Sequence, residues 1–203
     1  MAVSVWGSSQ GHFAIRDFTA LVLCLPVSQV KVVPMEVGGD FGGKLVVYVE
    51  PVAALLSKKT GHPVKITMTR AEVFEGTGAT AGGYIWAKIG ATKDGRITAA
   101  DAHLVYESGA FPGALVNLAS MTIFAPYDIP NARAEGYDVV VNKPKVAPYR
   151  APRGRAAGWG GGALIDELAV KLAMDPIEFR LLNAAKDGTR RITGILYKKV
   201  GYV

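Results

Sequence analysis

The stretch VGGDFGGK, residues 37–44, places four glycines around one acid and one aromatic residue. Glycine has no Cβ, so its backbone can take positive φ and its N–H group can come close to a bound molecule. An apolar run at residues 30–37 leads into the stretch, and an apolar helical pattern at residues 45–59 follows it. The pattern therefore predicts a loop between a strand and a helix that holds an oxygen-rich ligand, mainly through its main chain.

The nearest phosphate-binding pattern is G-x-x-x-x-G-K-[ST], and Gly38, Gly43 and Lys44 fall at its spacing. Leu45 stands where that pattern needs a hydroxyl group to hold magnesium. Nucleotide hydrolysis is therefore disfavoured. A degenerate P-loop nucleotide binder is kept as an alternative, as is a glycine-rich turn that holds no ligand.

Two further segments carry ligand-binding chemistry. Gln10 precedes a predicted helix at residues 12–23, where its amide could donate to a ligand oxygen beside the first helical N–H groups. Arg150 opens a second glycine-rich stretch at residues 149–162, and its guanidinium can donate several hydrogen bonds in a fixed fork. For Arg153 and Arg155 in the same stretch, we expect a solvent-exposed basic loop.

Four segments, in the same order, resemble the molybdenum hydroxylase family of xanthine dehydrogenase, aldehyde oxidase and carbon monoxide dehydrogenase. They are the serine and glutamine element ending at Gln10, the loop at residues 37–44, the segment PYRAP at residues 148–152 and the helical segment at residues 165–183. The resemblance implies the first molybdopterin-binding domain of a xanthine dehydrogenase or aldehyde oxidase large subunit. Residues 1–203 would form a single molybdenum-cofactor-binding domain, as a fragment of a larger catalytic subunit.

The resemblance implies a molybdenum cofactor, either molybdopterin or its dinucleotide. The protein would then supply orientation and hydrogen bonds while the cofactor carries the redox chemistry. In that family the glutamine reaches an oxygen on the metal, the backbone around the loop phenylalanine covers the metal, and the arginine lies near its coordination sphere. Carried over to this sequence, the cofactor-binding residues are Gln10, Gly39, Asp40, Phe41, Gly42, Gly43 and Arg150.

Several positions depart from the family pattern. Asp40 stands where the family usually has glycine, and Arg153 and Gly162 replace a more usual glycine and glutamate. Ala151 follows Arg150 where carbon monoxide dehydrogenases carry a cysteine, which disfavours carbon monoxide oxidation. The Gly-x-Gly-Glu context of the family's general base is absent, so no catalytic residue is assigned. We expect the chain alone to be inactive.

The implied reaction of the parent enzyme is hydroxylation of aldehydes or N-heterocycles with water-derived oxygen. The implied partners are the remaining large-subunit domains and iron–sulfur and flavin subunits, and a homo-oligomer is compatible with the sequence. The alternative is a non-catalytic binding or assembly module of the same fold. The three histidines are scattered and only one cysteine is present, so no side-chain metal site is predicted.

Composition narrows the class of protein. The 203 residues are 50% hydrophobic, enough for a substantial core, and no apolar run approaches the roughly 20 residues that span a bilayer. The single cysteine, Cys24, lies in an apolar run and predicts a buried, inert thiol, which fits the cytoplasm. Residues 143–203 hold 12 Lys and Arg against 5 Asp and Glu, without the aromatic pattern of a nucleic-acid reader. We therefore expect neither a membrane nor a nucleic acid as partner.

The periodicity predicts an α+β or α/β fold, with a mixed sheet and packed helices. The Asp94-Gly95 turn between two alternating runs is the clearest hairpin signal. Strands are expected at residues 30–37, 64–69, 84–92, 96–106 and 135–141, and helices at 12–23, 45–59, 70–75, 163–173 and 176–185. Pro51 indicates a kink in the second helix or a later start near Glu50.

Overall fold

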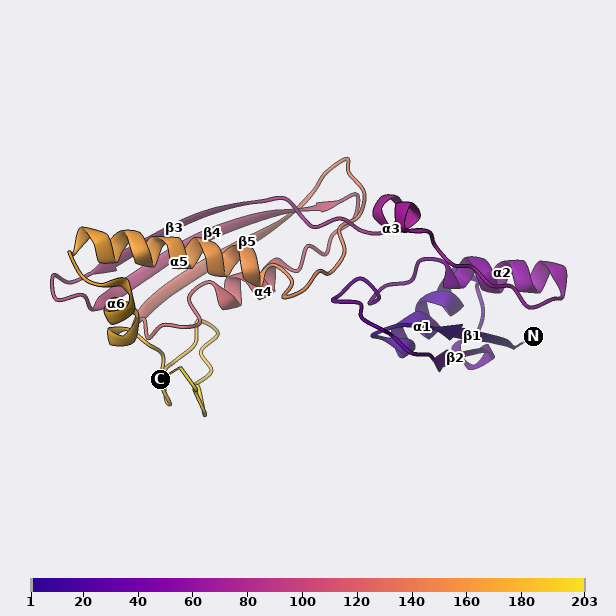
Figure 1. Cartoon of the computed structure of the whole chain (residues 1–203), viewed down its shortest axis with the longest axis horizontal. Helices are drawn as coiled ribbons and strands as arrows, with labels where there is room; N and C mark the ends of the chain where they lie inside the picture. The colour runs from indigo at the N-terminus through magenta and orange to yellow at the C-terminus, as the bar shows by residue number, and fades with distance from the viewer. Residues whose placement is uncertain (1, 203) are drawn as a thin grey trace. The chain divides into compact units, whose positions relative to one another are not determined.

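The structure is a computed structural model that describes residues 2–202. It contains helices and two β-sheets (Figure 1). The predicted combination of a mixed sheet with packed helices is confirmed. The contacts group into two compact units, unit 1 (residues 1–80 and 147–150) and unit 2 (residues 81–146 and 151–203). The expectation of a single domain over residues 1–203 stays a prediction.

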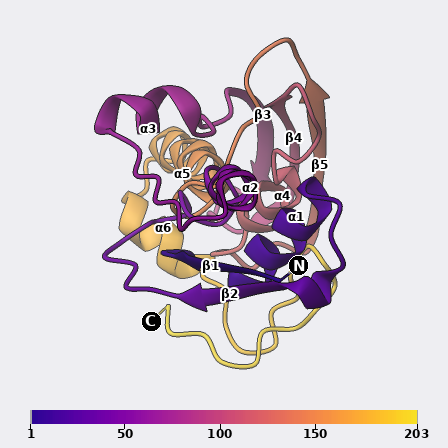
Figure 2. The same ribbon diagram turned by 90° about the vertical axis from the view of Figure 1, so that its right-hand side faces the viewer.

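Unit 1 is a small parallel β-α-β arrangement with two further helices. Strand β1 (Val3–Gly7) pairs in parallel with β2 (Val30–Pro34), and α1 (His12–Val22) and the short helix η1 (Val27–Gln29) connect them. The two strands lie side by side in Figure 2. The unit is completed by α2 (Glu50–Thr60) and α3 (Arg70–Gly76).

In unit 1 the structure decides between two predicted starts of one helix, and two other features differ from the sequence expectations. Helix α2 starts at Glu50 with Pro51 in its first turn, so the later of the two predicted starts is correct. Residues 64–69 alternate between half-buried and exposed side chains, yet they form no strand, because no ladder partner lies beside them in residues 2–202. Cys24 is exposed rather than buried, because it lies beyond the end of α1 at Val22, where its φ is 53°.

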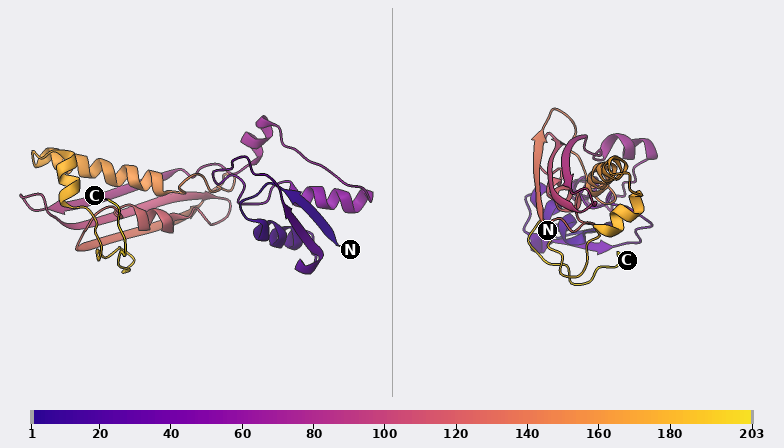
Figure 3. Two further views of the ribbon diagram at one scale, coloured as in Figure 1. Left: turned by 60° about the horizontal axis from the view of Figure 1, so that its bottom comes forward. Right: turned by 90° about the vertical axis from the view of Figure 1, so that its left-hand side faces the viewer.

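Unit 2 is a three-stranded sheet covered on one face by helices. Strand β4 (Ile97–Gly109) is central, antiparallel to β3 (Gly83–Ala91) and parallel to β5 (Asn131–Val140). The predicted hairpin is therefore confirmed. Helices α4 (Val116–Thr122) and α5 (Gly154–Lys171) pack on the sheet, and α6 (Pro176–Leu182) packs on α5 (Figure 3).

The core of unit 2 follows from alternation along β4. Ala102, Leu104 and Tyr106 occur at every second position and are at most 2% exposed, so one face of the strand is fully covered. Ile165 from α5 and Phe179 from α6 are equally buried in the same cluster. This packing fixes α5 on the sheet and positions its N-terminal end.

Helix α5 begins nine residues before the predicted start at residue 163, within the stretch expected to be a glycine-rich loop. Glycine costs about 1 kcal/mol relative to alanine in a helix, so the local signal opposed a helix there. Packing against the sheet overrides that signal. Packing requires one of these glycines, Gly161, because a Cβ there would lie 2.5 Å from the carbonyl oxygen of Ile123.

Gly158 and Gly162, by contrast, have open space where a Cβ would be. We expect Gly158→Ala and Gly162→Ala each to raise the free energy of unfolding by about 0.5 to 1 kcal/mol, because alanine loses less backbone entropy in a helix. Urea denaturation followed by circular dichroism measures this effect. Gly161→Ala is the matched control and should be destabilising. Equal effects at all three positions would contradict the packing described here.

The ion pair between Asp166 of α5 and Arg180 of α6 predicts a pH dependence of stability. The Arg180 hydrogen bond holds the pKa of Asp166 below its ordinary value of 3.8. A carboxyl whose folded pKa is lowered stabilises the fold above its unfolded pKa, and this stabilisation is lost as the pH falls through the folded pKa.

Asp166→Asn should therefore cost a few tenths of a kcal/mol near pH 7, within the range of about 0.2 to 1 kcal/mol for exposed pairs, and less near pH 2. Denaturant melts at the two pH values test this expectation. Glu167→Gln removes the same charge from the same helix without touching Arg180, and it should show no such difference. A loss that persists unchanged at pH 2 would exclude the ion pair as its cause.

Candidate cofactor-binding site

The candidate site lies entirely within unit 1, where two turns meet at one edge of its sheet. Because β1 and β2 are parallel, the turn after β1 and the loop after β2 leave the sheet at the same edge. Ligands of open α/β sheets commonly bind outside the carboxyl ends of parallel strands. The turn carries Gln10, and the loop carries residues 37–44.

Four hydrogen bonds join the turn after β1 to the segment of residues 36–44 that follows β2. The Ser8 hydroxyl donates to the Glu36 carbonyl oxygen at 2.7 Å, and the buried Ser9 hydroxyl donates to the Lys44 carbonyl oxygen at 3.1 Å. The Gln10 main-chain N–H donates to the same Lys44 oxygen at 3.1 Å. The Gly42 N–H donates to Gln10 Oε1 at 3.0 Å. The sequence reading did not single out Ser9, whose hydroxyl also accepts from the Gly11 N–H at 2.9 Å.

The hydrogen bond from Gly42 determines which part of the Gln10 side chain can bind a ligand. Its carbonyl oxygen is occupied by the loop amide, so its NH2 group, on an exposed side chain, is left to donate. The sequence reading assigned Gln10 a donor role just ahead of a helix. Helix α1 does begin at His12, two residues further on.

Contrary to the expectation from the sequence, the loop backbone does not present all of its N–H groups to a ligand. The amides of Gly42 and Gly43 are directed at protein acceptors, namely Gln10 Oε1 and the Asp40 carbonyl oxygen at 2.8 Å. Asp40 also accepts from the Gly42 N–H through Oδ1 at 3.4 Å. The helix that would have pointed its positive end at the loop begins only at Glu50. The glycines therefore shape the loop more than they offer donors.

Glycine is required at position 42 by a close approach of two backbones. Its φ is +102°, and a Cβ there would lie 2.9 Å from the carbonyl oxygen of Pro148. Residues 147–150 belong to unit 1, so the segment that ends in Arg150 lies directly against the loop. Gly39, with φ of +131°, also has a conformation that favours glycine.

Phe41 and Arg150 form the outer part of the site. Phe41 has φ of 49°, which is uncommon for a bulky residue, and its ring is 63% exposed. The Arg150 guanidinium carbon lies 5.6 Å from the centre of that ring, within the range of a cation–π contact. Strained residues concentrate at functional sites. An exposed aromatic ring held in this conformation is thus a feature that packing within unit 1 does not explain.

The Lys44 side chain joins the two ends of the loop by a hydrogen bond. Its Nζ donates to the carbonyl oxygen of Val37 at 2.6 Å, and so ties the last residue of the loop to the first. In a P-loop the equivalent lysine reaches the phosphates. The position of Lys44, together with Leu45, argues against the nucleotide-binding alternative.

The seven residues named from the sequence thus lie together in one region of unit 1. Gln10, Gly42 and Asp40 are joined by hydrogen bonds, Phe41 and Arg150 by the ring contact, and Gly39 and Gly43 complete the loop. The region offers an amide donor, a guanidinium and an exposed aromatic ring. Groups of this kind can hydrogen-bond to, and balance the charge of, an oxygen-rich anionic group, so this region is the candidate site.

The chain belongs to the family described as the molybdopterin cofactor-binding domain, which matches residues 1–184. It is 33% identical over 200 residues to the nicotinate dehydrogenase large molybdopterin subunit of Eubacterium barkeri, covering 97% of this chain and 47% of that one. It is 32% identical over 199 residues to the aldehyde oxidoreductase molybdenum-binding subunit PaoC of Escherichia coli O157:H7, covering 94% and 26%. The resemblance seen in the sequence is therefore confirmed.

Solved structures give the same result. The aldehyde oxidoreductase of Desulfovibrio gigas superposes with a TM-score of 0.89 at 28% identity, over 95% of this chain and 22% of that one. Quinoline 2-oxidoreductase of Pseudomonas putida 86 superposes with a TM-score of 0.88 at 25% identity, over 97% and 26%. The chain spans less than half the length of each relative named here.

The residues present fit the family's cofactor. The Gln10 carbonyl oxygen is held by Gly42, its NH2 group bonds to no acceptor within residues 2–202, Arg150 supplies positive charge, and the loop at residues 39–43 has no room for a Cβ at Gly42. Among residues 2–202, no group of three or more His, Cys, Asp or Glu side chains is placed to hold a metal ion directly. None of the helices in those residues combines the length and apolar character needed to cross a membrane.

Proposed function

We propose that this chain is the molybdenum-cofactor-binding portion of an oxidoreductase that hydroxylates aldehydes or N-heterocycles with water-derived oxygen. The observation that carries the proposal is the bond from the Gly42 N–H to Gln10 Oε1, with Arg150 beside Phe41. That bond occupies the Gln10 carbonyl oxygen and so leaves its NH2 group to donate, and its Gly42 donor lies on the same loop as Phe41, which contacts Arg150. The named relatives include nicotinate dehydrogenase and aldehyde oxidoreductase subunits, which supports this substrate range.

Each residue would have a defined part in holding molybdopterin or its dinucleotide. Gln10 would donate to an oxygen atom of the bound group, and Arg150 would balance negative charge. Phe41 would cover the group and keep water away, while Gly39, Asp40, Gly42 and Gly43 hold the loop in the required conformation. The cofactor, when bound, would supply the redox chemistry.

We assign no general base to this chain, and we expect no turnover from it alone. Substrate-dependent dye reduction should be absent from the purified 203-residue protein, with aldehydes and purines tested separately. Activity would require the remaining large-subunit domains and iron–sulfur and flavin partners in the cytoplasm, and homo-oligomerisation is compatible with this arrangement. Detection of turnover by the purified chain would refute this part of the proposal.

Exposed apolar side chains on unit 1 support the partner proposal. Phe13, Leu21 and Val22 of α1 are 75%, 72% and 61% exposed, although a helix with so many apolar residues normally has most of them covered. We propose that the remaining large-subunit domains cover this helix. Phe13→Ser with Leu21→Ser should improve the solubility of the isolated chain and weaken its association with those domains.

The proposal is tested by chemical analysis of the chain purified from a host that makes the molybdenum cofactor. Oxidation should release a fluorescent pterin from the protein, and magnesium-dependent ATP binding should be absent. Saturable Mg-ATP binding that requires Lys44, without any pterin, would favour the nucleotide-binding alternative. Pterin without turnover in the assembled complex would favour the non-catalytic binding or assembly module.

A further inference from the structure

Ser9 is a buried polar residue in the turn that carries Gln10. It is 3% exposed, whereas Gln10 beside it is exposed. Its hydroxyl is used in both directions, because Oγ donates to the Lys44 carbonyl oxygen at 3.1 Å and accepts from the Gly11 N–H at 2.9 Å. A serine hydroxyl has a single proton to donate, and the bond to Lys44 uses it. Ser9 therefore acts within the protein rather than on a ligand.

The two bonds of Ser9 hold the main chain on both sides of Gln10. The Lys44 carbonyl oxygen also accepts from the Gln10 N–H at 3.1 Å, so two consecutive residues of the turn are bonded to one atom at the end of the loop. On the other side, the Gly11 N–H is bonded to Ser9. The main chain of Gln10 thus lies between two anchored amides.

A fixed main chain matters because Gln10 has a long side chain at an exposed position. Its Oε1 accepts from the N–H of the buried Gly42 at 3.0 Å. Holding a glutamine side chain in one conformation costs rotamer entropy, and one hydrogen bond gives only a small net gain in water. The bond to Gly42 therefore depends on a backbone that cannot shift, and Ser9 supplies that restraint.

The neighbouring Ser8 makes a bond of the same kind at a different place. Its hydroxyl donates to the Glu36 carbonyl oxygen at 2.7 Å, at the beginning of the segment of residues 36–44. Ser9 bonds at the end of that segment, to the same atom as the Gln10 N–H. The two serines have the same chemistry and differ in the end that they hold, which makes Ser8 a matched comparison.

We propose that Ser9 is a positioning residue for Gln10. Its hydroxyl fixes the main chain of Gln10 on the end of the loop, so that Oε1 stays on Gly42 and the NH2 group remains available to the bound group. The inference rests on the proposed function for the nature of that group. The arrangement of Gln10 itself exists before anything binds, so it can be tested on the chain without cofactor.

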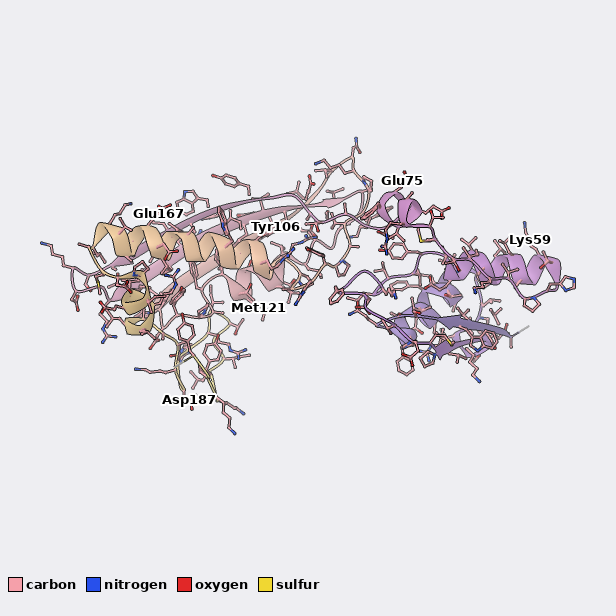
Figure 4. The ribbon with its side chains drawn as sticks, viewed as in Figure 1. Lys59, Glu75, Tyr106, Met121, Glu167 and Asp187 are labelled. Atoms are coloured by element: carbon pink, nitrogen blue, oxygen red, sulfur yellow. The ribbon has the colours of Figure 1, made fainter. Side chains whose placement is uncertain are left out.

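The first test is amide hydrogen exchange, followed by NMR, on the purified full chain prepared without cofactor. In Ser9→Ala the Gly42 and Gln10 amides should exchange about tenfold faster, because their acceptors are no longer held in place. The reference is the set of amides around the buried Ala54 in α2, the helix that carries Lys59 in its last turn (Figure 4). Those amides report the opening of unit 1 as a whole and should change by less than about twofold.

Ser8→Ala is the matched control, and it should leave the Gly42 exchange rate within about twofold of the unchanged chain. The proposal is overturned if Ser9→Ala leaves the Gly42 rate unchanged. It is also overturned if Ser9→Ala accelerates Gly42 and the α2 amides by the same factor, which would show a loss of overall stability alone. Equal acceleration of Gly42 by Ser8→Ala would overturn it too, because the whole turn would then have loosened.

The second test measures how fast pterin is lost on dialysis from the chain purified from a cofactor-producing host. Ser9→Ala and Gln10→Ala should each speed the loss about tenfold. The double variant should lose pterin no faster than Gln10→Ala, because Ser9 acts through Gln10, and additive effects would overturn the proposal. If the unchanged chain holds no pterin, the proposed function fails, and the exchange experiment still decides the role of Ser9.

Discussion

Gly42→Ala should lower the free energy of unfolding of unit 1 by about 2 to 5 kcal/mol and remove molybdenum-cofactor binding. The new Cβ would meet the Pro148 carbonyl oxygen at 2.9 Å and the Tyr149 nitrogen at 3.1 Å, and the backbone would keep a φ of +102° that alanine disfavours. The loop and residues 147–150 must then separate, which moves Arg150 away from Phe41. The Gly42 N–H is retained, so the change isolates the missing Cβ as the cause.

Gly38→Ala is the matched control for this substitution. Gly38 lies in the same loop with φ of +67°, but a Cβ there would meet nothing within 4 Å. It should cost only about 1 kcal/mol, through backbone strain, and it should preserve cofactor binding. Chemical denaturation and pterin content measure the two effects. Identical behaviour of the two variants would show that the contact with Pro148 is unimportant.

Asn183→Ala should cost about 3 to 5 kcal/mol in unit 2, because it leaves buried partners without hydrogen bonds. Asn183 is 4% exposed, and its side-chain NH2 donates to the carbonyl oxygens of Gly95 at 2.8 Å and Phe179 at 2.9 Å. Its Oδ1 accepts from the Ile97 N–H at 2.9 Å. One side chain thus joins the end of α6 to the turn of the β3–β4 hairpin.

Asn131→Ala provides the comparison for Asn183. The Asn131 side chain is exposed and donates to the Thr98 carbonyl oxygen at 3.1 Å, so its removal should cost less than about 1 kcal/mol. Urea denaturation of both variants gives the difference directly. A loss below 1 kcal/mol for Asn183→Ala would mean that water or a local shift satisfies the three backbone groups.

Sequence reasoning located the elements whose signals are local. Helices α1 and α6 follow from periodicity, and the β3–β4 hairpin follows from an Asp-Gly turn. The start of α5 could not be predicted in this way. Its glycines and arginines suggest a loop, and packing against the sheet and α4 stabilises residues 154–162 in helical form.

The candidate site was likewise predicted only in part from the sequence. The glycine loop and Gln10 could be found from residue type and order, and their contact follows from two strands being parallel, which the sequence did not establish. The main-chain amides expected to face the ligand instead bond to Gln10 and Asp40. Arg153 was expected in solvent because arginine usually is exposed, and its burial depends on Ala114, which is remote in sequence.

The measurement that tests the central claim most directly is the molybdenum-to-protein ratio of the chain purified from a cofactor-producing host. We predict that molybdenum co-purifies with the unchanged chain and that Gln10→Ala with Arg150→Ala abolishes it. Lys31→Ala, an exposed change on β2 away from these contacts, should keep the metal. Equal molybdenum in the double variant and the unchanged chain, or none in either, would contradict the claim that Gln10, the Phe41 loop and Arg150 form one cofactor site.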